Sequence, residues 1–145
     1  MLIGAMVEFS PDAALAQNGE GILGPHGNVI TGKKEFIEYC AQCHGMDATG
    51  DGPIAPDLKE RPADLTQLVP KNGGVFPEQD VRAFIDGTKA AYGHGTREMP
   101  SWGNVFRYGQ GGAYSGRIEE APESPALVKQ RIDLLVDYIK SIQKK

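Results

Sequence analysis

The residues best suited to chemistry in this chain form one short motif. Both cysteines of the 145-residue sequence lie in Cys40-Ala41-Gln42-Cys43, and His44 follows directly. Cys-x-x-Cys is too local to link distant parts of a chain, but it can act as a redox dithiol, supply half of a zinc site or attach a haem. The adjacent histidine favours haem, because its imidazole is placed to become the proximal ligand of the iron.

The two alternative chemistries each need features that this sequence does not show. A thioredoxin-like dithiol sits where a strand meets a helix in an α/β pattern, and no such pattern is visible. A structural zinc site needs four ligands, and the chain has no third cysteine. The motif therefore predicts one covalently attached haem c.

A six-coordinate haem iron needs a second axial ligand, and Met99 is the strongest candidate. Pro100 stiffens the backbone after it, which helps to hold a weak thioether bond in place. Trp102 follows closely, and its ring is expected to pack along the edge of the haem. We predict His44 and Met99 as the axial pair, a ligand set found in cytochromes.

His94 is the main alternative for the second axial position, because the glycines on either side of it would let the backbone approach the haem. Met46 lies only two residues from His44 and cannot reach the opposite haem face. The other candidates are weaker because they lie before the first expected helix: Met1, Met6 and His26.

These residues resemble the class I c-type cytochromes, and more narrowly the bacterial single-haem periplasmic cytochromes, over about residues 30–143. Gly32, Phe36 and Cys40 are spaced by four, like the first helix of that family, where the glycine permits close contact with the last helix. Tyr138 looks like the aromatic residue of the last helix that packs on this glycine and phenylalanine. The resemblance implies that the first and last helices cross.

The resemblance also implies several contacts to the haem. Pro56-x-Leu58 looks like the family's Pro-x-Leu, in which the proline carbonyl accepts the N–H of the proximal histidine and the leucine covers the haem. Pro53 is a rival for the proline's role. By analogy, Arg61 or Arg97 pairs with a haem propionate, although a solvated surface arginine is the alternative for each.

The first helix carries the start of the motif, and it is expected from Thr31 to about Ala41. Thr31 is a suitable cap and Glu35 stands where a capping helper would. Phe36, Ile37 and Cys40 share one face by three- and four-residue spacing. Residues 45–62 follow as a loop.

Three further elements are expected downstream. A helical turn is expected at 63–69, and a helix from Pro77 to about Asp86 ends at Gly87. The last helix starts at the cap Ser124 with Pro125 in its first turn. The inward-facing residues of these two helices are Val81, Phe84 and Ile85 in the first, and Leu127, Val128, Ile132, Leu135, Val136, Ile139 and Ile142 in the second. No strand is expected.

We therefore expect an all-α, cytochrome c-like fold with three to five helices around one covalently bound haem. Residues 1–30 read as an N-terminal extension, a signal-peptide remnant ending near Ala16 plus a loop. Residues 31–145 read as the cytochrome c domain, with a glycine-rich insertion at about 103–123. Length favours a single domain.

The formal charge of −4, from 19 acidic and 15 basic side chains, argues against nucleic acid as a partner. No general base, nucleophile or substrate pocket is evident, so we expect an electron carrier and not an enzyme. The expected partners are redox proteins: a dehydrogenase, an oxidase or a membrane complex.

The expected state is a periplasmic monomer, associated with a membrane only if the N-terminus is an anchor. The alternatives are a cytochrome subunit of a periplasmic dehydrogenase complex, and a haem sensor or catalyst with a labile sixth ligand.

Overall fold

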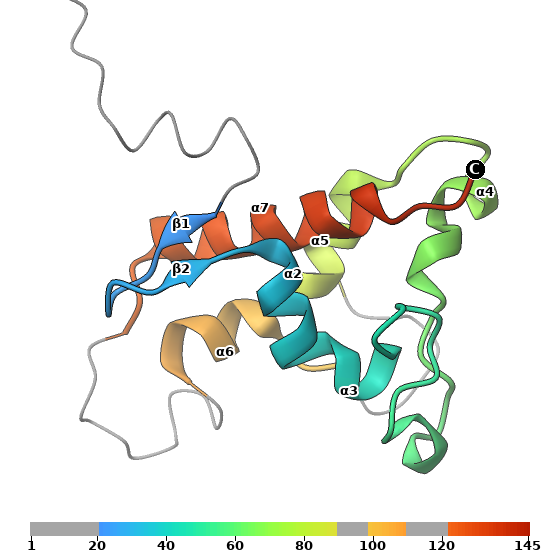
Figure 1. Cartoon of the computed structure of the whole chain (residues 1–145), viewed down its shortest axis with the longest axis horizontal. Helices are drawn as coiled ribbons and strands as arrows, with labels where there is room; N and C mark the ends of the chain where they lie inside the picture. The colour runs from blue at the N-terminus through green and yellow to red at the C-terminus, as the bar shows by residue number, and fades with distance from the viewer. Residues whose placement is uncertain (1–20, 90–98, 110–121) are drawn as a thin grey trace, which may run out of the picture.

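The computed structural model describes residues 21–89, 99–109 and 122–145, and most of their regular structure is helical (Figure 1). The elements in chain order are β1 (Ile22–Leu23), β2 (Val29–Ile30), α2 (Gly32–Glu35), the π-helical turn η1 (Phe36–Cys40), α3 (Ala41–His44), the 3-10 turns η2 (Ala55–Asp57) and η3 (Leu65–Gln67), α4 (Leu68–Lys71), α5 (Glu78–Asp86), α6 (Trp102–Tyr108) and α7 (Pro125–Ser141).

The expected first helix is present, and it runs through α2, η1 and α3 to His44. Thr31 caps it as predicted, since its Oγ1 accepts a hydrogen bond from the Lys34 N–H at 3.3 Å. Glu35 is not a capping helper: its side chain is buried and pairs with Arg131 instead. Ile37 was also wrongly placed, because it is 39% exposed and lies beside the buried face.

The first and last helices pack closely at Gly32, as the resemblance implied. A Cβ atom added to Gly32 would lie 2.0 Å from the Leu134 carbonyl oxygen of α7. One turn on, Phe36 is fully buried and its ring centroid lies 5.3 Å from that of Tyr138. Figure 1 shows α2 against the long helix α7.

Helix α7 supplies many of the buried apolar residues of the core. Ser124 Oγ accepts from the Leu127 N–H at 3.2 Å, which confirms the predicted cap. Leu127 and Ile142 are only partly buried. The remaining five predicted inward residues are buried, together with one charged residue that the apolar pattern did not indicate: Val128, Arg131, Ile132, Leu135, Val136 and Ile139.

Two shorter predicted elements are also present. Helix α5 ends at Gly87, whose φ of 96° is left-handed. Val81 and Ile85 of α5 are buried, whereas Phe84 is half-buried. The turn expected at 63–69 is found as η3 and α4, and it continues to Lys71.

Two segments expected to be loop form regular structure. Residues 22–30 form a short antiparallel hairpin, in which Ile22 pairs with Ile30 and Leu23 with Val29. Residues 103–108, placed in the glycine-rich insertion, belong to helix α6, whose Trp102, Gly103 and Phe106 are buried. Most of the predicted insertion, the predicted signal-peptide remnant, His94 and Arg97 lie outside the described residues.

No helix within residues 21–89, 99–109 and 122–145 combines the length and the apolar character that crossing a membrane requires.

Candidate haem site

The Cys-x-x-Cys-His motif lies inside the first helix, with Cys40 at the end of η1 and Cys43 and His44 in α3. Cys40 is 8% exposed and Cys43 is half-buried. Burial, reinforced by the charge of Glu35, raises the pKa of Cys40 to about 12, and burial also raises the pKa of Cys43. A dithiol enzyme needs a lowered thiol pKa, so this environment does not favour dithiol catalysis.

His44 has one ring nitrogen engaged by the protein. Its Nδ1 lies 3.0 Å from the Ala63 carbonyl oxygen. Because a carbonyl can only accept, Nδ1 carries the hydrogen, and the lone pair of Nε2 is left for a metal. Burial lowers the pKa of His44 and the bond to Ala63 opposes this, with a net lowering that favours the neutral imidazole.

The carbonyl that orients His44 is therefore that of Ala63, and the prediction of Pro56 was wrong. Pro56 lies exposed in the surface turn η2, and the rival Pro53 is exposed as well. The chain instead returns close to the motif at Pro62. This is seen at Gly50, which follows the motif, since a Cβ there would lie 2.2 Å from the Pro62 carbonyl oxygen. This close passage brings the next carbonyl to the imidazole.

The loop after the motif fastens the end of α3. The N–H groups of Gly50, Gly52 and Ile54 donate to the carbonyls of His44, Cys43 and Gln42 at 2.8, 3.1 and 3.1 Å. A Cβ on Gly52 would lie 2.3 Å from the Gln42 carbonyl oxygen, so only glycine fits there. The last carbonyls of a helix lack partners within the helix, and here this loop supplies them.

Three predicted haem-contact residues lie together beside this loop. Pro56, half-buried Leu58 and exposed Arg61 line one open hollow of about 370 Å³. The Arg61 Nε donates to the Gly50 carbonyl at 3.2 Å. Arg61 therefore braces the loop that holds the motif.

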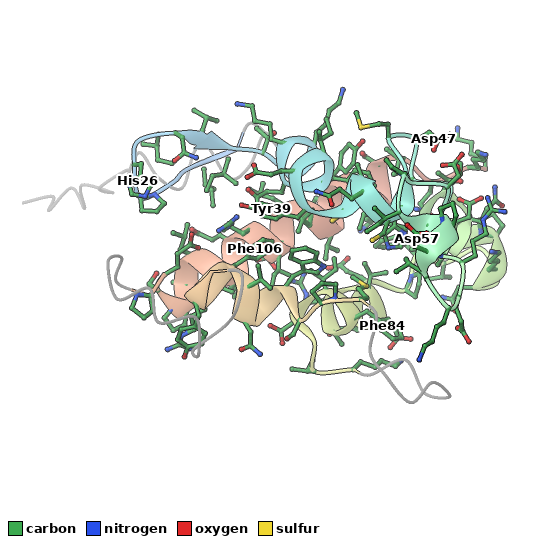
Figure 2. All side chains as sticks on the ribbon, turned by 90° about the horizontal axis from the view of Figure 1, so that it is seen from below. His26, Tyr39, Asp47, Asp57, Phe84 and Phe106 are labelled. Atoms are coloured by element: carbon green, nitrogen blue, oxygen red, sulfur yellow. The ribbon has the colours of Figure 1, made fainter. Side chains whose placement is uncertain are left out.

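Met99 and Trp102 lie on the side of the core formed by α6. Met99 is half-buried and packs against the hydrophobic core, and Trp102 is 8% exposed. The Trp102 ring centroid lies 5.6 Å from that of Tyr39 and 6.0 Å from that of Phe106. Figure 2 labels Tyr39 and Phe106, which come from the motif-bearing helix and from α6 and lie near each other in the middle of the molecule.

The sequence interpretation missed one buried charged group at the site, Arg131 with Glu35 and Glu123. Arg131 and Glu35 are 6% and 4% exposed. Burial alone would lower the pKa of Arg131, but the two carboxylates raise it overall, and burial raises the pKa of Glu35 against the opposing charge of Arg131. The signal for it was a basic residue standing within the apolar stripe of α7.

The donor set fits the chemistry of a haem c. It comprises two thiols, one imidazole with a free nitrogen and one thioether at the edge of the apolar core. Across the described ranges, no three His, Cys, Asp or Glu side chains gather in a way that could hold a metal ion.

A comparison with known protein families agrees with this chemistry. Residues 27–110, more than half of the chain, match the family model described as cytochrome C oxidase, cbb3-type, subunit III. The chain belongs to this cytochrome c family. No solved structure matches the chain.

The matched stretch of this cytochrome holds the cysteine–histidine motif, Ala63 and Met99, whereas α7 lies beyond it. The mostly helical structure fits a cytochrome c-like fold. Membership of the family implies haem-based electron transfer, and the family indicated by the sequence resemblance is thereby confirmed.

Proposed function

We propose that this cytochrome is an exported single-electron carrier with one haem c, attached through Cys40 and Cys43 and ligated by His44 and Met99. The observation that carries the proposal is the engagement of His44 Nδ1 by Ala63, because it leaves Nε2 as the ligating nitrogen. The motif supplies the two attachment thiols, and Met99 supplies a thioether at the border of the core.

When bound, the haem supplies the one-electron Fe(II)/Fe(III) couple. The chain's own residues set the conditions for it. The Ala63 carbonyl orients the imidazole of His44 and strengthens it as a donor. A methionine sulfur as the partner ligand favours the ferrous state and raises the potential relative to a second histidine. Trp102 keeps water from its side of the core.

The test is the absorption spectrum of the purified protein in both oxidation states, including the weak long-wavelength ferric band given by an iron–methionine sulfur bond. We expect that band in the wild type and its loss in Met99→Ala. Met46→Ala is the matched control, because Met46 is 67% exposed and adjoins the motif. The control should keep the band.

The other spectra that could appear overturn this ligand assignment. A low-spin spectrum without the band would identify a nitrogen ligand, for which His94 is the candidate, and a lower potential. A high-spin spectrum with ready carbon monoxide binding would identify an open site and a sensor or catalyst. Mass spectrometry of the denatured protein tests covalent attachment, since the mass must exceed that of the polypeptide by one haem.

A second candidate function is that of an electron-transferring subunit within a larger oxidoreductase. The family model that matches the chain is described as an oxidase subunit, which favours this candidate. Purification from the native source under mild conditions separates the two, because a subunit co-purifies with its enzyme and a free carrier does not. The periplasm is the compartment proposed in both cases, and the distribution of the protein after osmotic shock tests it.

A further inference from the structure

Arg131 of α7 binds two carboxylates, that of Glu35, 96 residues away in α2, and that of Glu123, eight residues away just before α7. Its Nε and Nη2 both donate to Glu35 Oε2, at 2.9 and 2.8 Å. Its Nη1 donates to Glu123 Oε1 at 2.7 Å. The side chains of Arg131 and Glu35 are 8% and 6% exposed, so this is a buried network and not a surface ion pair.

The same guanidinium also packs on helix α6, through the ring of Phe106. The Cζ atom of Arg131 lies 3.9 Å from the ring centroid of Phe106 and 5.6 Å from that of Tyr39. The two rings are themselves 5.4 Å apart in an edge-on arrangement. The position of Phe106, and with it α6, is therefore defined by a stacked cation and a ring from the motif-bearing helix.

Stability alone does not account for a charged network at this place. Removing charges from water is costly, and well-packed apolar residues of similar volume often hold the same elements at least as firmly. What the guanidinium adds is direction, since its planar fork donates hydrogen bonds at fixed angles. The network thus favours one placement of α6 over others that would bury the same area.

Helix α6 in turn carries Met99 at its entrance. Ser101 precedes the helix, and its Oγ donates to the Asp86 carbonyl of α5 at 2.8 Å. At the other end, the Glu123 N–H donates to the Arg107 carbonyl at 3.1 Å. Only Pro100 separates Met99 from Ser101, so a shift of α6 is passed to the methionine through a stiff link.

We propose that Arg131 is a positioning residue for the axial methionine: by fixing α6 against α2 and α7, it keeps the Met99 sulfur on the iron. This inference rests on the proposed function, since it takes Met99 as a ligand. It assigns to Arg131 a role in how readily an external ligand displaces Met99.

The experiment measures imidazole binding to the ferric, haem-loaded, full-length protein through loss of the iron–methionine band, at a temperature well below the unfolding midpoint. Arg131→Lys keeps the charge but loses the fork and the stacking. The double variant Arg131→Met with Glu35→Leu replaces the pair by apolar volume. Glu123→Gln is a milder change that removes one carboxylate charge. Arg82→Met is the control, because Arg82 forms half-exposed ion pairs with Glu78 and Asp133.

We expect both Arg131 variants to bind imidazole at least tenfold more tightly than the wild type, Glu123→Gln to shift in the same direction by less, and the control to match the wild type. A role in stability alone would lower the unfolding midpoint and leave imidazole affinity unchanged, and that result overturns the inference. The double variant and Glu123→Gln decide the question if Arg131→Lys fails to accumulate. A wild type without the band overturns the proposed ligation itself, which separates the two failures.

Discussion

At Gly32 the absence of one side chain sets the distance between the first and last helices. The nearest atom to a Cβ at this position is a backbone oxygen of α7 at 2.0 Å, and Tyr138 Cβ follows at 2.9 Å. Backbone cannot turn aside as the end of a flexible side chain can. Any substitution there must separate two helices that carry the core of the molecule.

We therefore expect Gly32→Ala to lower the free energy of unfolding by about 1–3 kcal/mol, the usual range for overpacking a core. Urea unfolding of the haem-loaded protein, followed by circular dichroism, measures it. Lys33→Ala is the control, because Lys33 is an exposed neighbour in the same helix. Equal losses in the two variants would contradict the close approach.

A second residue-scale prediction concerns Asp64, whose Oδ1 accepts from the Thr66 Oγ1 at 2.6 Å and the Thr66 N–H at 2.9 Å. These bonds hold the pKa of the Asp64 carboxyl below its usual range. A lowered folded pKa contributes stability that is present above the unfolded value and is lost as pH falls through the folded one.

Asp64→Asn keeps a capping oxygen and removes this titration. We expect the wild type to exceed the variant in stability by at most about 1 kcal/mol near neutral pH, since Asp64 is solvent-screened, and to lose that advantage below about pH 4. Thermal unfolding midpoints over a pH series measure the difference. Parallel curves for the two proteins down to low pH would refute it.

Among the elements, the loop that fastens α3 depends on Gly52, since a Cβ there would meet the backbone of Gln42 and Cys43 at 2.3 and 2.6 Å. Gly52→Ala should push the loop off the motif, lower stability by about 1–3 kcal/mol and reduce the fraction of protein carrying haem.

Gly73→Ala is the matched control for Gly52→Ala, because Gly73 has a φ of 65° and open space around it. An alanine at this position would have an unfavourable left-handed φ, but its Cβ would not clash with any other atom. Absorbance per polypeptide and denaturant unfolding give the two readouts. The loop has no such role if the control loses as much haem as Gly52→Ala.

How far the sequence predicts these elements depends on how local their signals are. Helices α5 and α7 have caps and a repeated apolar stripe, and both were predicted with nearly correct ends. The hairpin strands have two residues each, too few for an alternating pattern to appear. Helix α6 was missed because Gly103 reads as a breaker, although glycine is needed there because a Cβ would lie 2.8 Å from the backbone carbonyl oxygen of Asp86.

The site shows the same division. The motif and its neighbours can be recognised from the sequence because they are contiguous in the chain. The partner of His44 is 19 residues away and the Glu35 partner of Arg131 is 96 residues away, so neither could be read from spacing. A carbonyl oxygen also carries no side-chain signature, which explains why a family pattern placed at Pro56 was misleading.

For the molecule as a whole, apolar packing is concentrated between α7 and the helices around it, and the stretch 45–62 depends on the motif. Leu135 and Val136 are fully buried, whereas Met46 and Ile54 are 67% and 39% exposed. Without haem, the helical half has its own core and the loop half does not.

We expect a Cys40→Ser/Cys43→Ser variant, which cannot attach haem, to keep slow amide exchange in α7 and to lose it in residues 45–62. Hydrogen–deuterium exchange followed by mass spectrometry compares it with the haem-loaded protein. A uniform rise in exchange over the described helices would show instead that the haem holds the entire fold.

The burial of Cys40 also dictates an order of events during maturation of the protein. In the finished fold this thiol is almost inaccessible, with a pKa of about 12, and it lies in a core completed by residues of α7 near the end of the chain. If haem is joined to Cys40, the reaction has to be finished before α7 docks, so the attachment machinery and the closing helix compete for the same unfolded chain. Mutations that hasten this docking would then lower the yield of cytochrome while leaving the mature protein unharmed.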